Sequence, residues 1–495
     1  MTIKPQYETY RYTGEITRLK SQSIVECRMP GSEIGSILAV QASATPTECV
    51  CADGEVRYSG KLTLCIVYED GNRKVCRAER GAEFFHKAEG SAVSPACFVK
   101  AAFSVDNVSY RREGSGLYIS VIVGADLPVY GGKQMEYLVG GEGIIAKKEP
   151  LTLRRSVCVS GETEGEDEFE TDYVGDVLLH GENVVVTRVS VGAGQIDIEG
   201  ELNLHVCVLK ENDAICSYER LIPLHLQIPC EEAFGNVTAS ARVCVKAAQL
   251  NAGVDEEKGK SKIVFSYALF ADCFLYASDE LLVASDAFST DAELLLKKAN
   301  DGGMYLTNLV KCTERVSGVA ALSPDVESEY ALVAAVLPRA ELHCRKTEKG
   351  FEAEGVLNAE ILLKSADGGY RCSTLSLPFA FPLDVRAESV EADCMVCGLN
   401  VRRNRGGETE AEATLKISLR AYQKGEWEYV LEAVEGEPIA KSDAAISVFA
   451  LGAGEELWQA AKRLSRDPEE LQRSNPELTF PVKEGERIFV YRQIK

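Results

Sequence analysis

The chain has 495 residues, more than one hydrophobic core can organise, and 45% of them are hydrophobic, so three or four globular domains are expected. Its 54 basic and 76 acidic residues give a net charge of −22. An acidic excess of this size repels phosphate backbones and anionic lipids, which argues against nucleic-acid and membrane-surface partners. Because the sequence begins without a signal pattern and contains no apolar run long enough to span a bilayer, we expect a cytosolic protein with no membrane insertion.

Three segments share one pattern of alternating apolar and polar residues around a glycine anchor. The anchors are Gly60, Gly200 and Gly355. Twenty-three residues after each anchor stand, in order, Glu83, Pro223 and Pro378. Such alternation is typical of half-buried strands, and a glycine within it marks a bulge or a close backbone approach. We therefore predict a mainly β chain with three tandem antiparallel repeats, each resembling a β-sandwich or a partly closed barrel.

Changes in composition indicate where these units begin and end. Residues 161–172 form an acidic run, which we expect to be a solvated linker, with a docking site for a basic partner as the alternative. The Asn-Asp-Gly-Gly cluster at 300–303 predicts a turn or a linker, and residues 291–299 are the best helix candidate within the units. The expected domains are three β-rich repeats and a C-terminal module, over residues 1–160, 173–299, 300–440 and 446–495.

No pattern in the sequence predicts an enzyme, a metal site or a cofactor. The five histidines lack metal-ligand spacing, and neither a phosphate-binding loop nor a Gly-x-Ser-x-Gly elbow in strand–helix context is present. The 17 cysteines are irregularly spaced, so we expect most to be reduced and buried rather than paired in disulfides. The pairs Cys49–Cys51 and Cys394–Cys397 lack the second pair that a zinc site needs. We therefore expect no catalytic, metal-binding or cofactor-binding residues.

The pattern changes from strands to short helices at Ile446. Residues 446–449 predict a strand, and the apolar residues of 457–464 recur at the spacing of one helix face. Asp467 followed by Pro468 predicts the start of a second helix. That helix ends at Asn475-Pro476, and residues 485–490 predict a closing strand. The expected order of this module is β-α-α-β.

The run from Gly454 to Leu464, followed by Asp467-Pro468, Asn475-Pro476 and Pro481-Val482, resembles a LysM module. In LysM modules that bind N-acetylglucosamine polymers, the ligand lies between the turn before the first helix and the loop after the second. The family typically has an acidic residue and then Thr or Ser after the turn glycine, whereas this chain has two glutamates. The resemblance implies a groove for a partner or a glycan at Gly454, Glu455, Glu456, Leu457, Trp458, Ser474, Asn475, Pro476 and Val482. For Leu457 and most of the Trp458 ring, packing in a small core is the alternative.

The order of the domains resembles that of the SPOCS–LysM proteins of anaerobic endospore formers. These are spore-coat morphogenetic factors of the mother-cell cytosol, which bind a polymerising coat ATPase at the forespore surface. The resemblance implies a non-enzymatic scaffold in sporulation that binds this ATPase through its LysM and SPOCS-like domains. Self-association through exposed strand edges is a further hypothesis. The alternatives are a LysM protein that binds peptidoglycan or another N-acetylglucosamine polymer, and an enzyme with its site in one β-rich unit.

Overall fold

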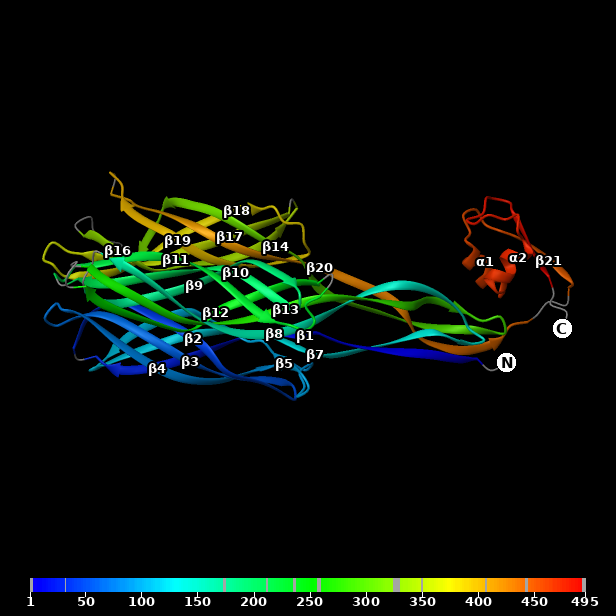
Figure 1. The fold of residues 1–495 in the computed structure, drawn as a ribbon, viewed down its shortest axis with the longest axis horizontal. Helices are drawn as coiled ribbons and strands as arrows, with labels where there is room; N and C mark the ends of the chain where they lie inside the picture. Colours follow the sequence, from blue (N-terminus) through cyan, green and yellow to red (C-terminus); the bar gives the residue numbers. More distant parts are fainter. Residues whose placement is uncertain are drawn as a thin grey trace.

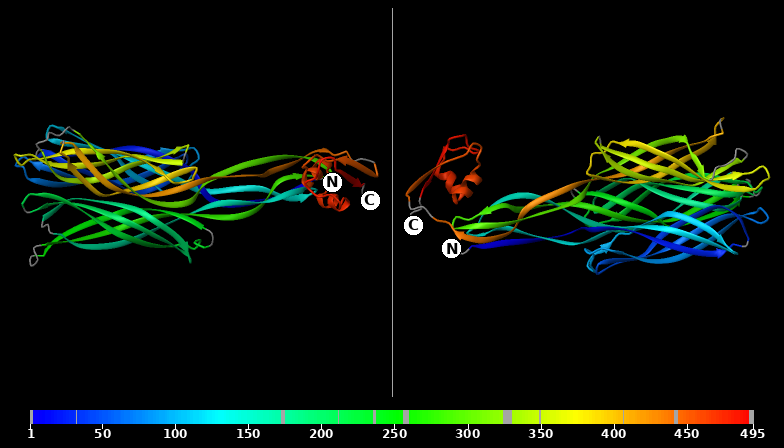
Figure 2. Two further views of the ribbon diagram at one scale, coloured as in Figure 1. Left: turned by 90° about the horizontal axis from the view of Figure 1, so that it is seen from above. Right: turned by 180° about the vertical axis from the view of Figure 1, so that it is seen from behind.

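The residues that the structure describes are mainly in β-strands, with two short helices near the C-terminus (Figures 1 and 2). None of the described helices is long and apolar enough to cross a membrane. The computed structural model describes residues 3–31, 33–171, 175–210, 212–234, 237–255, 260–323, 330–348, 350–405, 407–440 and 444–491.

Three consecutive segments, here called the first, second and third units, each supply two antiparallel sheets. In the first unit one sheet consists of β1 (Lys4–Pro30), β7 (Gly116–Glu142), β5 (Phe98–Val99) and β6 (Ala102–Glu113), and the other of β2 (Ile34–Ala52), β3 (Glu55–Asp70) and β4 (Val75–Glu89). In the second unit the sheets are β8 (Ile145–Thr171), β13 (Lys260–Phe288) and β12 (Val237–Asp255), and β9 (Gly175–Gly192), β10 (Gln195–Lys210) and β11 (Ile215–Pro229). In the third unit they are β14 (Ala292–Val319), β20 (Thr409–Pro438) and β19 (Ser389–Arg403), and β16 (Ala331–Thr347), β17 (Gly350–Lys364), β18 (Tyr370–Leu383) and β15 (Ala321–Ser323).

Each unit buries an apolar core between its two sheets. In the first unit, Leu62, Leu64 and Ile66 of β3 belong to one buried cluster with Leu117 and Ile119 of β7. Matching clusters fill the second and third units. The buried residues alternate along the strands because successive side chains point to opposite faces of a sheet. The mainly β, antiparallel class predicted from the sequence is thus confirmed.

The three anchor glycines lie in the middle strands β3, β10 and β17, at points where another group approaches the backbone. A Cβ on Gly60 would lie 2.5 Å from the Phe84 ring, and one on Gly200 would lie 2.8 Å from the carbonyl oxygen of Val185. A Cβ on Gly355 would overlap the carbonyl oxygen of Glu341 and lie 2.5 Å from the Phe379 ring. The close approach predicted from the sequence is confirmed at all three positions.

The longest strands continue beyond the sandwiches as three paired ribbons, which pack together into a stalk (Figures 1 and 2). The three sandwiches form a head at the other end of the molecule. Leu138, Ala284 and Val430 meet in one fully buried contact within the stalk, and they are spaced 146 residues apart in the sequence. The stalk also carries hydrogen bonds between units, such as the one from the Ala433 amide to the Tyr7 hydroxyl at 3.1 Å.

Three expectations about local structure were wrong. Residues 161–171, expected to be a linker, lie in β8 and pair with β13, whereas Asp172 and Tyr173 lie outside the described residues. The glutamates of residues 161–171 occupy every second position, so their side chains line the exposed face of β8. Residues 292–299, expected to be helical, and the supposed turn at 300–303 lie in β14 and pair with β20. Pairing with a long neighbouring strand overrides the local preference of these residues for a helix or a turn.

The unit boundaries follow from strand pairing. The paired strands of the three units run over residues 4–142, 145–288 and 292–438. The expected domain ends at 160 and 299 therefore lie inside β8 and β14. Each unit begins and ends with one of the long stalk strands, so its first and last segments are paired with each other.

The C-terminal module has the order β21 (Ile446–Ala450), α1 (Leu457–Leu464), α2 (Pro468–Ser474) and β22 (Arg487–Tyr491). Asp467 caps α2 as its sequence position predicts, because its side chain accepts hydrogen bonds from the amides of Glu469 and Glu470. The small core of the module includes Ala460, Ala461, Leu471 and Ile488. The helices cover one face of the two-stranded sheet.

A substitution tests the close approach at the anchor glycines. We expect Gly355→Ala to destabilise the third unit by about 2 kcal/mol or more, since neither the Glu341 carbonyl nor the Phe379 ring can withdraw without disturbing the sheet. Differential scanning calorimetry of the full chain should show a lower unfolding midpoint. Gly132→Ala is the control, because a Cβ at this exposed strand position meets no atom within 4 Å. Equal midpoints for the two variants would contradict the packing described.

Candidate functional site

The structure brings the two expected walls of the C-terminal groove together. Gly454 occupies the left-handed region at φ +77°, which turns the chain into α1. Its amide donates to the carbonyl oxygen of Val482 at 2.9 Å, and the Val482 amide donates to the carbonyl oxygen of Glu455 at 3.1 Å. The turn before α1 and the loop after α2 are therefore joined by two backbone hydrogen bonds.

The two glutamates of the turn have different roles. Glu455 accepts a hydrogen bond from the Gly452 amide at 2.9 Å and from two nitrogens of Arg463 at 3.0 and 3.2 Å. The guanidinium of Arg463 lowers the pKa of Glu455, so its carboxylate is ionised and held against the module. Glu456 is the N-cap of α1 and forms a reciprocal capping box with Gln459, while its side chain remains exposed. Glu456 is thus the carboxylate of the turn that a partner can reach.

Asn475 and Val482 stabilise the module itself. The Asn475 amide group donates to the carbonyl oxygens of Leu471 at 2.9 Å and Phe489 at 2.8 Å, and its oxygen accepts from the Phe489 amide at 2.8 Å. Only 5% of Asn475 is exposed, and Val482 is part of the core. Ser474 is half-buried at the end of α2, and Pro476 is exposed beside it. Of these four residues, Pro476 is the most accessible to a ligand.

Trp458 connects the module to the stalk. Its indole nitrogen donates to Asp286 of β13 at 2.8 Å, and its ring meets that of Phe288 edge to face at a centroid distance of 5.1 Å. Lys462 also binds Asp286, at 2.5 Å. The alternative of packing in a small core holds for Leu457 and for part of the Trp458 ring, but the cluster they join also includes Phe288 and Ile145 of the stalk. Sequence reasoning missed this contact because its two sides lie about 170 residues apart.

An open cleft runs between the module and the stalk. The stalk contributes Lys147, Glu149, Lys298 and Glu428 to its lining, and the module contributes Glu456, Trp458, Gln459 and Lys462. Lys147 pairs with Glu149 at 2.7 Å and Lys298 with Glu428 at 2.5 Å. Because these charges compensate one another, the cleft suits a partner of mixed polarity better than a single strongly charged group.

The cysteines offer little nucleophilic character. All 17 are free thiols. Cys394 packs into the core of the third unit, whereas Cys397 lies in a separate cluster with Val185 and Met395, so the two face different surroundings. Burial raises the pKa of each to about 12, which keeps both protonated at neutral pH. Among the described residues, no three or more His, Cys, Asp or Glu side chains gather as metal ligands.

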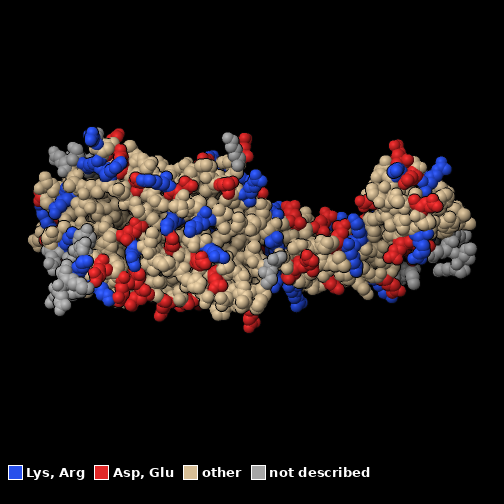
Figure 3. Space-filling model, turned by 45° about the horizontal axis from the view of Figure 1, so that its top comes forward, with Lys and Arg blue, Asp and Glu red and all other residues tan. Residues whose placement is uncertain are grey.

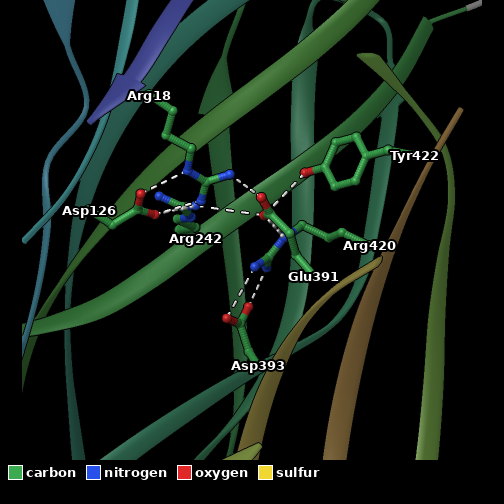
Figure 4. A network of polar contacts seen from close by, with 7 residues as sticks. All are labelled: Arg18, Asp126, Arg242, Glu391, Asp393, Arg420 and Tyr422. Atoms are coloured by element: carbon green, nitrogen blue, oxygen red, sulfur yellow. Dashed lines mark hydrogen bonds and ion pairs between the residues drawn. The ribbon is translucent and has the colours of Figure 1, made fainter. Parts of the chain in front are cut away.

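A network of ion pairs joins the three units (Figure 4). Arg18 of the first unit binds Asp126 at 2.6 Å and also pairs with Glu391 of the third unit. Arg242 of the second unit lies 3.2 Å from Asp126 and 3.7 Å from Glu391. Arg420, which is 4% exposed, contacts Glu391 at 3.3 Å and also pairs with Asp393.

This network links the three units through shared ion pairs. Burial opposes ionisation of Asp126 and Glu391, but the neighbouring guanidiniums, Arg18 foremost, outweigh it and lower both pKa values. The sequence gives no signal for this network, since its members are spread from residue 18 to residue 420 and each sits in an ordinary strand pattern.

Comparisons with known proteins leave the family of this chain open: no protein-family model, no curated protein and no solved structure matches it. The arguments for function therefore depend on the residues and geometry described above.

The docking of the module on the stalk can be tested at Asp286. Burial raises the pKa of Asp286, but hydrogen bonds from Lys462 and Trp458 outweigh this and lower it overall. The docked contact is therefore at full strength above the ordinary aspartate pKa of about 3.9 and is lost as pH falls through the lower docked value. We expect Asp286→Ala to release the module even at neutral pH. In a Trp427→Phe background, Trp458 fluorescence should then shift to the red as water reaches the indole.

The control is Glu280→Ala, which removes an exposed carboxylate from the same strand. Unchanged fluorescence in Asp286→Ala, or the same shift in both variants, would contradict the docked arrangement.

Proposed function

We propose that this chain is a non-enzymatic scaffold for assembling a spore coat or envelope. In this proposal the three units are copies of one SPOCS-like repeat, and the C-terminal module is a LysM domain that recruits a polymerising coat ATPase. The scaffold would act in the mother-cell cytosol, at the forespore surface. The observation that carries the proposal is the placement of the module at the tip of the stalk, away from the head (Figure 1).

The module supports this proposal through what it leaves exposed. The turn at Gly454 and Glu456 and the loop at Pro476 are accessible, while Asn475, Val482 and Glu455 are engaged in holding the two walls together. A surface of this kind is a prearranged contact whose exposed groups need little reordering on binding. A protein partner can use the exposed carboxylate of Glu456 for orientation and the exposed ring of Pro476 for affinity.

The separation of the two ends supports a scaffold in particular. Acidic and basic side chains are interspersed over the head and the stalk on the face shown in Figure 3. A molecule with one contact surface at the stalk tip and others on the head can link partners that lie apart. Weak contacts at linked sites then reinforce one another through effective concentration.

The second candidate is binding of peptidoglycan or another N-acetylglucosamine polymer. The observation that favours it is the approach of the two walls on which LysM modules hold sugars. Against it stands the turn itself, where Glu455 is held by Arg463 and no hydroxyl occupies either position after Gly454. A titration with a protein partner and with sugar, described next, distinguishes the two candidates.

The experiment titrates the full chain with the coat ATPase and, separately, with N-acetylglucosamine oligomers. We expect saturable binding of the ATPase and no response to sugar. Glu456→Gln should weaken ATPase binding about tenfold, because it removes the reachable charge while keeping an oxygen that can cap α1. Glu469→Gln is the matched control, since it neutralises an exposed carboxylate in the first turn of α2.

Saturable sugar binding without ATPase binding would contradict the scaffold proposal and favour a protein that binds cell-wall glycan. Equal losses in Glu456→Gln and Glu469→Gln would instead show that the turn is not the contact.

A further inference from the structure

Three strands of the head sheets pair with the strands that carry the anchor glycines: β4, β11 and β18. β4 and β11 are edge strands, and β18 also pairs with the three-residue strand β15 over Thr374–Ser376. Glu83, Pro223 and Pro378 are equivalent within them, because each pairs with the residue that follows an anchor glycine. Two of these three strands thus carry proline where the third, β4, carries glutamate.

The prolines reveal which way the backbone faces at this position. Proline has no amide hydrogen, yet pairing with the middle strand continues on both sides of Pro223 and Pro378. A residue at this position therefore directs its amide away from the strand that carries the anchor glycine. Pro229 and Pro382 lie an even number of residues further on and so face the same way. β11 and β18 therefore each lack two of the outward amide donors that an added strand would need.

β4 keeps its full set of donors. No proline occurs between Val75 and Glu89, and β4 pairs with β3 without a register shift. Within the described part of the chain, its second edge has no strand partner. β11 lies against β16 and β18 against β2, whereas the main neighbours of β4 belong to its own unit. Val75, at the start of β4, packs into the core shared by the three units. Towards the other end of the strand, Glu83, Phe85 and Lys87 are exposed.

The side chains on this open edge are complementary to themselves. Phe85 is 77% exposed, more than any other large hydrophobic residue among those described, and the flanking Glu83 and Lys87 point to the same face. If a second copy of β4 pairs in the antiparallel direction about Phe85, the two Phe85 rings meet. Each Glu83 then lies opposite the Lys87 of the other copy. A surface that is complementary to itself about a two-fold axis fits a second copy of the same chain.

We propose that two copies of this chain associate through antiparallel pairing of their β4 strands about Phe85, which joins the β2–β3–β4 sheets of the two heads into one. The stalks and C-terminal modules take no part in this contact, so it leaves them available to other partners. The inference goes beyond the proposed function and does not depend on what the module binds.

The test measures the mass of the full chain by sedimentation equilibrium from about 2 µM to about 200 µM, the range in which a small interface associates. We expect a monomer–dimer equilibrium. Glu83→Pro should abolish the dimer, since it removes two symmetry-related hydrogen bonds. The β2–β3–β4 sheet should tolerate this proline, because the equivalent sheets of the other two units contain Pro223 and Pro378 at the same position. Circular dichroism checks that the variant folds.

A charge exchange provides a test that needs no proline. Glu83→Lys and Lys87→Glu should each weaken the dimer about tenfold, because each places like charges opposite one another twice. The double variant should restore association to near the original strength. A chain that stays monomeric throughout, a dimer unaffected by Glu83→Pro, or a double variant no better than either single one would overturn the proposal.

Discussion

The packing of three long ribbons around a common line is the constraint on which the rest of this structure depends. Leu138, Ala284 and Val430 meet there with no exposed surface, and each comes from the closing strand of a different unit. Because these strands continue into the sandwiches, the contact fixes how the three sandwiches of the head face one another. It also creates the stalk tip on which Phe288 and Asp286 receive the C-terminal module.

The charged network that joins the three units follows from the same constraint. Bringing three sheets together encloses side chains that would otherwise be solvated, and an enclosed charge must be paired. Arg18, Arg242 and Arg420 come from three units and share the carboxylates of Asp126, Glu391 and Asp393. Removing one member would take an opposite charge away from its partly buried partners, so the network favours one mutual arrangement of the units. A fixed arrangement suits a molecule that presents surfaces at two distant ends.

The sequence predicts those features that local patterns determine. Alternation identified the strands, the anchor glycines marked close approaches, and Asp467 marked the start of α2. The acidic run and residues 292–299 were misjudged because their pairing partners lie more than 80 residues away. The constant spacing of 146 residues, which also relates Tyr130, Tyr276 and Tyr422, was hidden because the glycine anchors are 140 and 155 residues apart. At the candidate site, position alone could not separate the exposed Glu456 from Glu455 and Asn475, which the module uses internally.

The measurement that tests the central claim most directly is hydrogen–deuterium exchange of the full chain with and without the coat ATPase. If the chain is a scaffold that presents its module from the stalk tip, amides of 453–458 and 474–482 should become protected in the complex. The fully buried stalk contact should exchange slowly in both states, since the ribbons stay packed. Protection confined to the head, or exchange in the module that responds to N-acetylglucosamine oligomers and not to the ATPase, would contradict this account.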